Sequence, residues 1–423
     1  MSESSLLLAL LGAVVGAVAL LVFRASPRAT MVVWTLVLFF VPIWVGVSLG
    51  IVWSAITLMT LAAIAASVTD VRLGAIDVLV GVFALLVLVQ LALQLSTLSA
   101  SVIAVLEWLV PYIWGRLVLA RVPGLDIARI LAAAATVAAI LALIEFATGR
   151  NAFVALPGPG NAAEWARLQP RAGFLRAEGA FGHSIALGAA LAMSTPFVLV
   201  ARWRPWATAL SLVVIVGAVV VTFSRIGLVA LALTLALSAA LLPGVRRSVR
   251  WLVVLGGAAA VGVVVPFLGA VFADAGDEAS GSADSRSGQL ALLSQIRPFG
   301  SAGDWSGRMV DGVYFGEYAD SIDSTLLLVG LRFGWVPLAV LTLVLLAVAL
   351  GALRSPNPAA LAVAGQLPGL VAVALITQFG PLLWFLVGLA VAWRLRERED
   401  AELARPPVSL PAARPRTATA ARP

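Results

Sequence analysis

The sequence predicts an all-α, polytopic helical membrane protein with about 12–13 transmembrane helices and one large extracytoplasmic loop. Of its 423 residues, 61% are hydrophobic and only 12% are charged, and the mean hydropathy is +1.05. A soluble domain is about half apolar and about a quarter charged, so this excess of apolar residues exceeds what a water-soluble core can bury. The composition therefore excludes a disordered chain, a coiled coil and a cytosolic enzyme.

The absent residue types narrow the chemistry further. The chain has no cysteine and a single histidine, and all 28 basic residues are arginine. Disulfides, cysteine-ligated zinc, thiol nucleophiles and histidine-cluster metal sites are excluded, as is a lysine Schiff base. We expect no metal and no cofactor. The net charge of +7 on its own would suggest nucleic-acid binding. The positions of the arginines, described below, instead favour the bilayer as partner.

The order of apolar and polar segments predicts six regions. Stretches near the roughly 20 residues that cross a bilayer lie at 5–23, 30–46, 50–68, 74–95, 99–119, 127–148, 184–201, 206–222, 226–243, 251–272, 323–350, 359–376 and 380–393. The regions are N-terminal transmembrane helices (1–148), an extracytoplasmic loop (149–183), central transmembrane helices with a Ser-Arg turn (184–272), a large extracytoplasmic loop (273–322), C-terminal transmembrane helices (323–393) and a disordered cytoplasmic tail (394–423).

The distribution of arginines predicts the orientation. Nineteen of the 28 arginines fall in loops that alternate with the spans and in the tail, and the positive-inside rule places these in the cytoplasm. Both long connections are then extracytoplasmic. We expect a multi-pass protein of the cell (plasma or inner) membrane with a cytoplasmic C-terminus, whereas the side of the N-terminus depends on how the early spans are divided. The nine remaining arginines each call for an anionic ligand or a paired acid: Arg150, Arg167, Arg171, Arg176, Arg225, Arg286, Arg297, Arg308 and Arg332.

A tight turn places Arg225 at the outer boundary of the membrane. Ser224 and Arg225 join two apolar runs with almost no loop between them. A guanidinium forks two hydrogen bonds onto phosphate oxygens, so this position suits a lipid-linked diphosphate. The alternative is an arginine that snorkels to the lipid head-groups.

A second segment places two charged residues beside the only histidine. Arg176 and Glu178 are followed by Gly179, Gly182 and His183 just before an apolar run begins. The glycines allow a tight backbone turn that presents the charged pair. A lone histidine at a helix start is more often a cap or a satisfied polar residue than a catalyst.

The third segment, Ser321-Ile-Asp-Ser-Thr-Leu, ends the large loop. Asp323 stands where a helix N-terminus is expected, so its carboxylate is either an N-cap that binds orphan backbone amides or a general base at the membrane surface. The sequence alone leaves both open.

In this order and spacing, the three segments resemble the O-antigen ligase and polymerase family of bacterial membrane proteins. The family pattern is an Arg with Gly-x-Phe-Gly-(His/Asn), a Ser-Arg-Gly-like turn, and a large outer loop with an Arg and Gly-x-Gly that ends in a His-Asn or Asp-Asn pair. The resemblance covers roughly residues 165–345, and its matching positions are Arg176, Gly179, Phe181, Gly182, His183, Ser224, Arg225, Arg286, Gly300–Gly303, Asp323 and Ser324.

The resemblance implies a metal-independent glycosyltransferase. Such proteins transfer a glycan from a polyprenyl diphosphate to an acceptor hydroxyl, on a glycan or a lipid, at the outer face of the membrane. It implies that Arg176, Arg225 and Arg286 bind the diphosphate and that Asp323 activates the acceptor. Glu178, His183, Ser224, Ser324 and Arg308 would support them, and other polysaccharide-assembly proteins are candidate partners.

Departures from the pattern favour polymerisation over ligation to lipid A core. Ligases of that kind resemble one another in a His where this chain has Asp323, and Ile226 and Ser324 replace the usual Gly and Asn. The chemistry of the reaction is consistent with this resemblance, because a diphosphate leaving group needs charge stabilisation that guanidinium groups can supply. The large loop has eight acids against three arginines but no Asp-x-Asp pair suited to Mg²⁺.

Two other classes stay open. A flippase or transporter of lipid-linked sugars would place charges at the bilayer midplane, where Glu107 and Arg332 are candidates unless they pair with each other. A non-catalytic membrane subunit would tolerate loss of every outer arginine. A glycosyltransferase requires Arg176, Arg225 and Asp323 to converge on one outer cavity.

Overall fold

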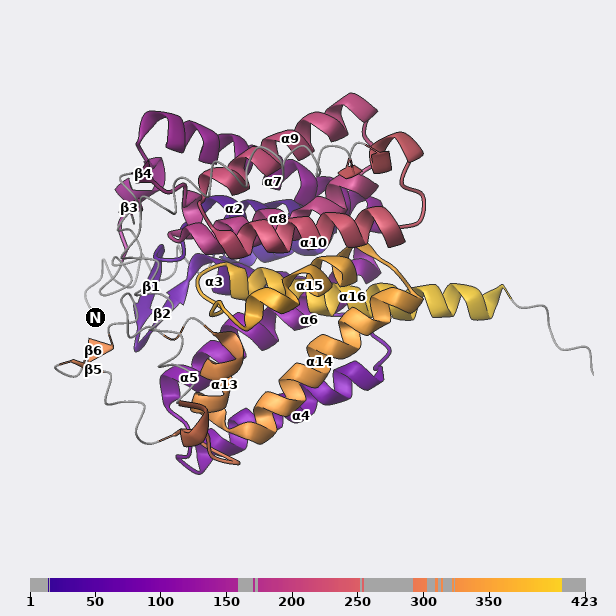
Figure 1. Ribbon diagram of the computed structural model, residues 1–423. Coiled ribbons are helices and arrows are strands. Elements are labelled where there is room, and N and C mark those ends of the chain that lie inside the picture. The colour runs from indigo at the N-terminus through magenta and orange to yellow at the C-terminus, as the bar shows by residue number, and fades with distance from the viewer. Residues whose placement is uncertain are drawn as a thin grey trace, which may run out of the picture.

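The structure is a computed structural model that describes residues 14, 16–158, 170–171, 174–251, 253–254, 292–302, 309–310, 313–314, 322 and 324–404 (Figure 1). Within these ranges the regular structure is overwhelmingly helical, and strands occur only in three two-stranded antiparallel sheets. The predicted all-α class of the fold is therefore confirmed at this level.

The N-terminal half forms helices that pack side by side. Its elements are α2 (Pro27–Phe40), β1 (Gly46–Leu49), β2 (Ile51–Ser54), α3 (Ala55–Ala66), α4 (Ala75–Ala92), α5 (Leu98–Ile103), the π-helix η1 (Ala104–Leu109), α6 (Val110–Arg121), α7 (Gly124–Thr148), η2 (Ala152–Ala155), β3 (Pro170–Arg171) and β4 (Phe174–Leu175). The α5, η1 and α6 segments form one continuous helical rod.

The C-terminal half adds a second set of helices. Its elements are η4 (Gly179–Phe181), α8 (Ser184–Val200), α9 (Pro205–Val221), α10 (Arg225–Leu241), η5 (Leu292–Gln295), β5 (Met309–Val310), β6 (Val313–Tyr314), α13 (Thr325–Phe333), α14 (Trp335–Arg354), α15 (Pro358–Leu370) and α16 (Phe379–Leu403).

Five described helices are long and apolar enough to cross a membrane: Ala75–Ala92, Leu98–Arg121, Gly124–Thr148, Trp335–Arg354 and Phe379–Leu403. Shorter apolar helices, such as α8, α9 and α10, pack among them. These lengths and compositions are those of a multi-pass helical membrane protein. The total of 12–13 spans stays a prediction.

The chain between residues 41 and 54 differs from the predicted division into spans at 30–46 and 50–68. Helix α2 ends at Phe40, and β1 and β2 pair across Gly50, which has a φ of +73°. Pro42 cannot continue the helix, and the β-branched and aromatic residues that follow favour strands. Apolar composition alone could not distinguish this hairpin from a helix.

The predicted single span over 323–350 is two helices. Gly334 separates α13 from α14 with a φ of +92°, a conformation that suits glycine. A Cβ atom at this position would lie 2.7 Å from the carbonyl oxygen of Arg297 and 2.8 Å from that of Pro298. The close approach of the 297–299 backbone therefore requires glycine here, and α13 turns away from the axis of α14 (Figure 1).

The last helix extends further than the predicted boundary at residue 393. Helix α16 continues to Leu403, and two side-chain contacts tie part of its charged segment to the rest of the chain. Arg396 donates a 2.9 Å hydrogen bond to the carbonyl oxygen of Leu119, and Glu399 forms a 3.1 Å ion pair with Arg72. The remainder of the predicted tail, from residue 405, lies outside the described residues.

Helices α6 and α16 pack closely at the centre of the bundle. A Cβ on Gly115 would meet the carbonyl oxygen of Phe385, and a Cβ on Gly388 would meet that of Tyr112. Small residues allow helix backbones to approach each other in membrane proteins. This interface buries Arg116, whose Nε lies 2.7 Å from Oδ1 of Asp77.

Arginine side chains connect several helix ends at one end of the bundle. Arg28 pairs with Asp126 at 2.5 Å, and Arg121 donates to the carbonyl oxygens of Ala66 and Arg24 at 2.6 and 2.8 Å. All three arginines belong to the set predicted to be cytoplasmic, and α16 projects from the same end (Figure 1). The arginine-rich connections thus gather at one end, as predicted, while the side of the membrane that this end faces stays a prediction.

Candidate functional site

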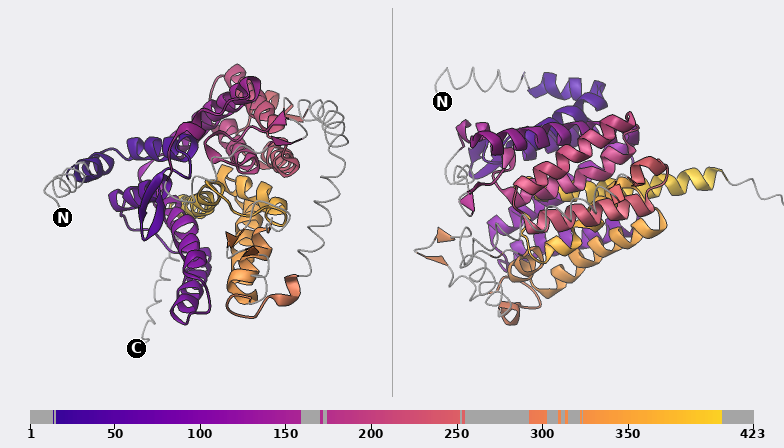
Figure 2. Two further views of the ribbon diagram at one scale, coloured as in Figure 1. Left: turned by 90° about the vertical axis from the view of Figure 1, so that its left-hand side faces the viewer. Right: turned by 45° about the horizontal axis from the view of Figure 1, so that its top comes forward.

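The segments around Arg176 and Arg225 meet at the opposite end of the bundle, which Figure 2 (left) shows nearly end-on. The backbone amide of Ala177 donates to the carbonyl oxygen of Val221 at 3.2 Å, and Nε of Arg176 donates to that of Thr222 at 3.0 Å. Arg176 is buried, and the carbonyl at the end of α9 orients its guanidinium. Two segments that are separated by more than forty residues are therefore joined directly.

The Ser-Arg turn is built for a close helix contact. Phe223 adopts a φ of +49°, and Oγ of Ser224 accepts a 2.9 Å hydrogen bond from the amide of Gly227, which caps α10. A Cβ on Gly188 of α8 would lie 3.6 Å from Cα of Gly227. The turn thus has its glycine one position after Ile226, where α8 and α10 come together.

Arg225 is the first residue of α10 and its side chain is exposed. The N-terminus of a helix already carries partial positive charge, so an arginine here raises the local positive potential instead of compensating it. Arg176 is held at the Thr222 carbonyl, three residues before Arg225 in the chain.

A buried carboxylate that the sequence analysis did not single out positions this segment. Glu145 near the end of α7 accepts hydrogen bonds from the amides of Glu178 at 3.1 Å and Gly179 at 2.9 Å. The side-chain amide of Asn151 donates to Glu145 at 2.9 Å and to the carbonyl oxygen of Gly179 at 3.0 Å. The turn that follows Arg176 is thereby fixed from both sides.

A glutamine forms a second support. Nε2 of Gln378, at the start of α16, donates to the carbonyl oxygens of Ala180 and Val41, each at 3.0 Å. Both Glu145 and Gln378 are polar residues within long apolar stretches of the sequence. Such residues are costly in a membrane and generally face a polar partner, which is the signal that could have identified them.

His183 is the N-cap of α8. Its Nδ1 accepts a 3.2 Å hydrogen bond from the amide of Ile185, and its side chain is only partly exposed. The pKa of His183 lies well below its ordinary value, first because burial penalises the charged imidazolium and second because Arg176 is positive. The neutral ring therefore acts as a cap, in line with the simpler of the two interpretations above.

At the third segment, Ser324 is the N-cap. Its Oγ accepts from the amide of Leu327 at 3.2 Å. Thr325 contacts the connection before α16, because its amide and hydroxyl both donate to the carbonyl oxygen of Val373, at 2.9 and 2.6 Å. This connection also carries Gln378, which links the start of α13 to the turn at Ala180.

Of the predicted site residues, the structure thus places Arg176, Glu178, His183, Ser224, Arg225 and Ser324 at one end of the bundle. Asp323, Arg286 and Arg308 lie outside the described residues. Within the described part of the chain, no three His, Cys, Asp or Glu side chains are grouped so that they could hold a metal ion.

The candidate midplane charges interact with each other. Glu107, in the π-helix η1, and Arg332, near the end of α13, are coupled electrostatically. A π-helical turn inside an α-helix often marks a functional position. Here it contains a glutamate that is influenced electrostatically by Arg332, and direct pairing of the two stays a prediction.

The fold is that of a helical membrane protein, and two arginine-bearing segments meet at one end of its bundle. No protein-family model matches the chain, and neither a curated protein nor a solved structure is significantly similar to it. The residues and their geometry therefore carry the functional argument.

Proposed function

We propose that the protein transfers a glycan from a polyprenyl diphosphate to an acceptor hydroxyl at the outer membrane face, in a polysaccharide polymerisation reaction. The observation that carries the proposal is the hydrogen bond between Arg176 and the Thr222 carbonyl, three residues before Arg225. It brings two guanidinium-bearing segments together at the helix end predicted to face outward. The resemblance described above supplies the reaction class.

In the proposed reaction, the acceptor oxygen attacks the anomeric carbon of the carrier-linked glycan. The bond from that carbon to the diphosphate oxygen breaks, and the polyprenyl diphosphate leaves with the bonding electrons. Arg176 and Arg225 stabilise the developing negative charge by hydrogen bonding. Asp323 accepts the proton of the acceptor hydroxyl, which makes it the proposed general base.

Position and preorganisation support the assignment of Arg176. Its guanidinium is held by a backbone carbonyl, and the following turn is held by Glu145 and Asn151. A preorganised positive charge stabilises the transition state more than a mobile one does, because the protein does not have to reorganise during the reaction. Arg225, in contrast, is exposed, so the carrier can reach its guanidinium from outside the bundle.

Glycan transport is the main competing function, and the electrostatic interaction between Glu107 and Arg332 weakens its argument from isolated midplane charges. The membrane, the carrier glycan and an acceptor glycan or lipid are the proposed partners, with other assembly proteins as additional ones. We propose the cell membrane as location, with the end that carries the tail in the cytoplasm.

A reconstituted assay tests the proposal. The full chain in liposomes is supplied with a defined polyprenyl-diphosphate oligosaccharide, and products are separated by size with and without EDTA. Polymer growth that is insensitive to EDTA is the expected result. Movement of the labelled lipid across the vesicle membrane without any new glycosidic bond would overturn the proposal in favour of transport.

A further inference from the structure

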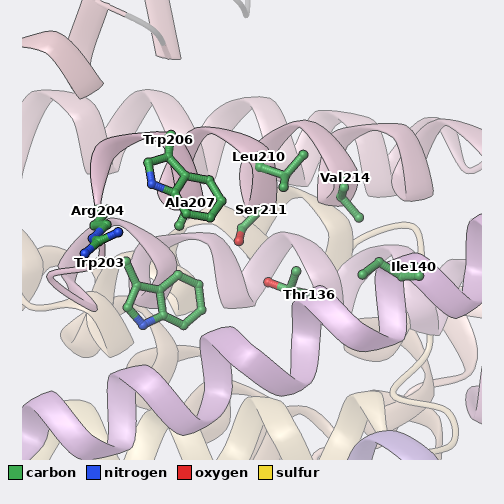
Figure 3. A pocket seen from close by; sticks show the side chains of 9 residues that line it. All are labelled: Thr136, Ile140, Trp203, Arg204, Trp206, Ala207, Leu210, Ser211 and Val214. Carbon is green, nitrogen blue, oxygen red and sulfur yellow. The ribbon is translucent and has the colours of Figure 1, made fainter.

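A groove lies between α7 and α9 at the surface of the bundle, away from the candidate site. Its volume is about 640 Å³, within the usual range for small-molecule sites. Thr136 and Ile140 line it from α7, and Trp206 and Leu210 line it from α9 (Figure 3).

The walls of the groove suit a hydrocarbon chain. Leu210 and Val214 continue the apolar lining along α9. The hydroxyl of Thr136 already donates to the carbonyl oxygen of Ala132 at 2.7 Å, so it is engaged within its own helix. Trp206 and Leu210 are 64% and 55% exposed, which leaves a long apolar surface open to whatever surrounds the bundle.

One end of the groove is cationic and aromatic. Trp203 and Arg204 lie there, in the short connection between α8 and α9, together with Trp206 (Figure 3). Among the described residues, no acidic side chain lines the groove and no ion pair involves Arg204. Tryptophan and arginine at a helix end are typical of the depth at which lipid head-groups lie.

The backbone of the connection that carries Arg204 is conformationally restricted. Arg202 has a φ of +56°, and Pro205 begins α9, so few backbone conformations are open to the residues between them. Nε of Arg129 donates to the carbonyl oxygen of Ala201 at 3.1 Å, which adds a second positive charge near the same end. Positive charge is therefore concentrated where the apolar groove ends.

We propose that this groove binds an anionic phospholipid of the surrounding bilayer, with an acyl chain between α7 and α9 and its phosphate on Arg204. The apolar walls exclude a free phosphate ion as the main occupant. An amine in the head-group would find no acidic partner among the described residues that line the groove. The groove therefore favours an anionic head-group over a zwitterionic one. The proposal does not depend on the glycosyltransferase function.

Native mass spectrometry of the full chain tests the proposal. The delipidated protein is titrated with phosphatidylglycerol and, separately, phosphatidylcholine of the same acyl length. We expect Arg204→Gln to weaken phosphatidylglycerol binding about fivefold, the effect of one basic residue at an anionic surface, and to leave phosphatidylcholine binding unchanged. Arg202→Gln is the matched control, because Arg202 is exposed in the same connection but does not line the groove.

A second variant tests the acyl chain. Ala207→Phe fills the groove from α9, so it should weaken the binding of both lipids. Arg204→Gln should weaken the binding of the anionic lipid only. Neither change removes a helix cap, since Arg204 makes no capping side-chain bond at the start of α9. Thermal unfolding in detergent verifies that each variant is folded, and Leu210→Ala, which widens the groove, replaces Ala207→Phe if the latter does not fold.

The proposal is overturned by any of three results. Equal effects of Arg204→Gln and Arg202→Gln would show a diffuse charge effect. Unchanged lipid binding in a folded Ala207→Phe or Leu210→Ala variant would place the lipid elsewhere. A dimer that Ala207→Phe dissociates, with lipid binding unchanged, would identify a second copy of the chain as the occupant.

Discussion

The amide of Gly179 donates a 2.9 Å hydrogen bond to the buried carboxylate of Glu145, 34 positions earlier in the chain. The contact joins the end of α7 to the turn that follows Arg176. Asn151 bonds to both partners, so three residues form one closed hydrogen-bonded unit. The orientation of the Arg176 segment therefore depends on a residue in a neighbouring helix.

Glu145→Gln should lower the stability of the protein by about 1–3 kcal/mol, the cost of a buried amide without an acceptor. Glutamine keeps one oxygen but turns an NH₂ group toward a backbone N–H. The melting temperature in detergent measures the effect. Because Asn151 belongs to the same unit, the effects of Glu145→Gln and Asn151→Ala should be non-additive in the double variant. Strict additivity would contradict the closed unit.

Arg225→Lys should strongly reduce carrier turnover while membrane insertion is unchanged. Lysine keeps the charge but loses the planar fork that binds two phosphate oxygens. Arg202→Lys, an exposed arginine at the opposite end of the bundle, is the control and should retain wild-type turnover. Full activity of the Arg225→Lys variant would leave this residue as an arginine that only reaches the head-groups.

Asp323→Asn should abolish glycan transfer without loss of stability. General-base help is worth about 100- to 10,000-fold in rate, and asparagine cannot accept the proton. Ser324→Ala is the matched control, because it removes the cap of α13 and should cost about 0.5–2 kcal/mol of stability with a smaller effect on rate. Asp323→His should retain part of the activity. A fully active Asp323→Asn variant would move the base elsewhere, with Glu178 examined next.

His183→Asn should flatten the dependence of stability on pH. The folded protein resists protonation of His183, whereas the unfolded chain protonates near pH 6.5. Below that pH the unfolded state binds more protons than the folded state. The free energy of unfolding of the wild-type protein therefore decreases as the pH is lowered below about 6.5, by up to about 1.4 kcal/mol per pH unit. Asparagine can still cap α8. Melting curves between pH 7 and pH 5 measure the difference, and parallel curves for both proteins would contradict the lowered pKa.

Thiol labelling should distinguish the two ends of the bundle in intact cells. The chain has no native cysteine, so single replacements at Ser280, Val154 and Arg247 give clean signals. An impermeant reagent should label the first two and spare Arg247→Cys until the membrane is opened. Labelling of the Arg247 replacement alone would reverse the orientation and with it the proposed outer face.

Hydropathy predicted the helical membrane class, and the arginine pattern predicted which connections gather at one end. The sequence pattern also indicated the segments around Arg176 and Arg225, whose contact the structure describes. It did not indicate Glu145, because the partners of a buried carboxylate are set by helix packing between distant positions. Nor did it predict the break at Gly334, which depends on the approach of the 297–299 backbone. Ser324 and Asp323 are both good capping residues, and only local geometry distinguishes them.

The glycine contact between α6 and α16 has a consequence for biosynthesis. Helix α16 lies more than 250 residues after α6 in the chain, so the surface around Gly115 and Gly388 forms only after α16 has entered the membrane. Until then the Asp77–Arg116 pair lacks the helix that covers it. A chain truncated before Phe379 would leave this charged pair exposed to lipid or to insertion factors. Shielding of the Asp77–Arg116 pair therefore depends on a helix that is distant in the sequence.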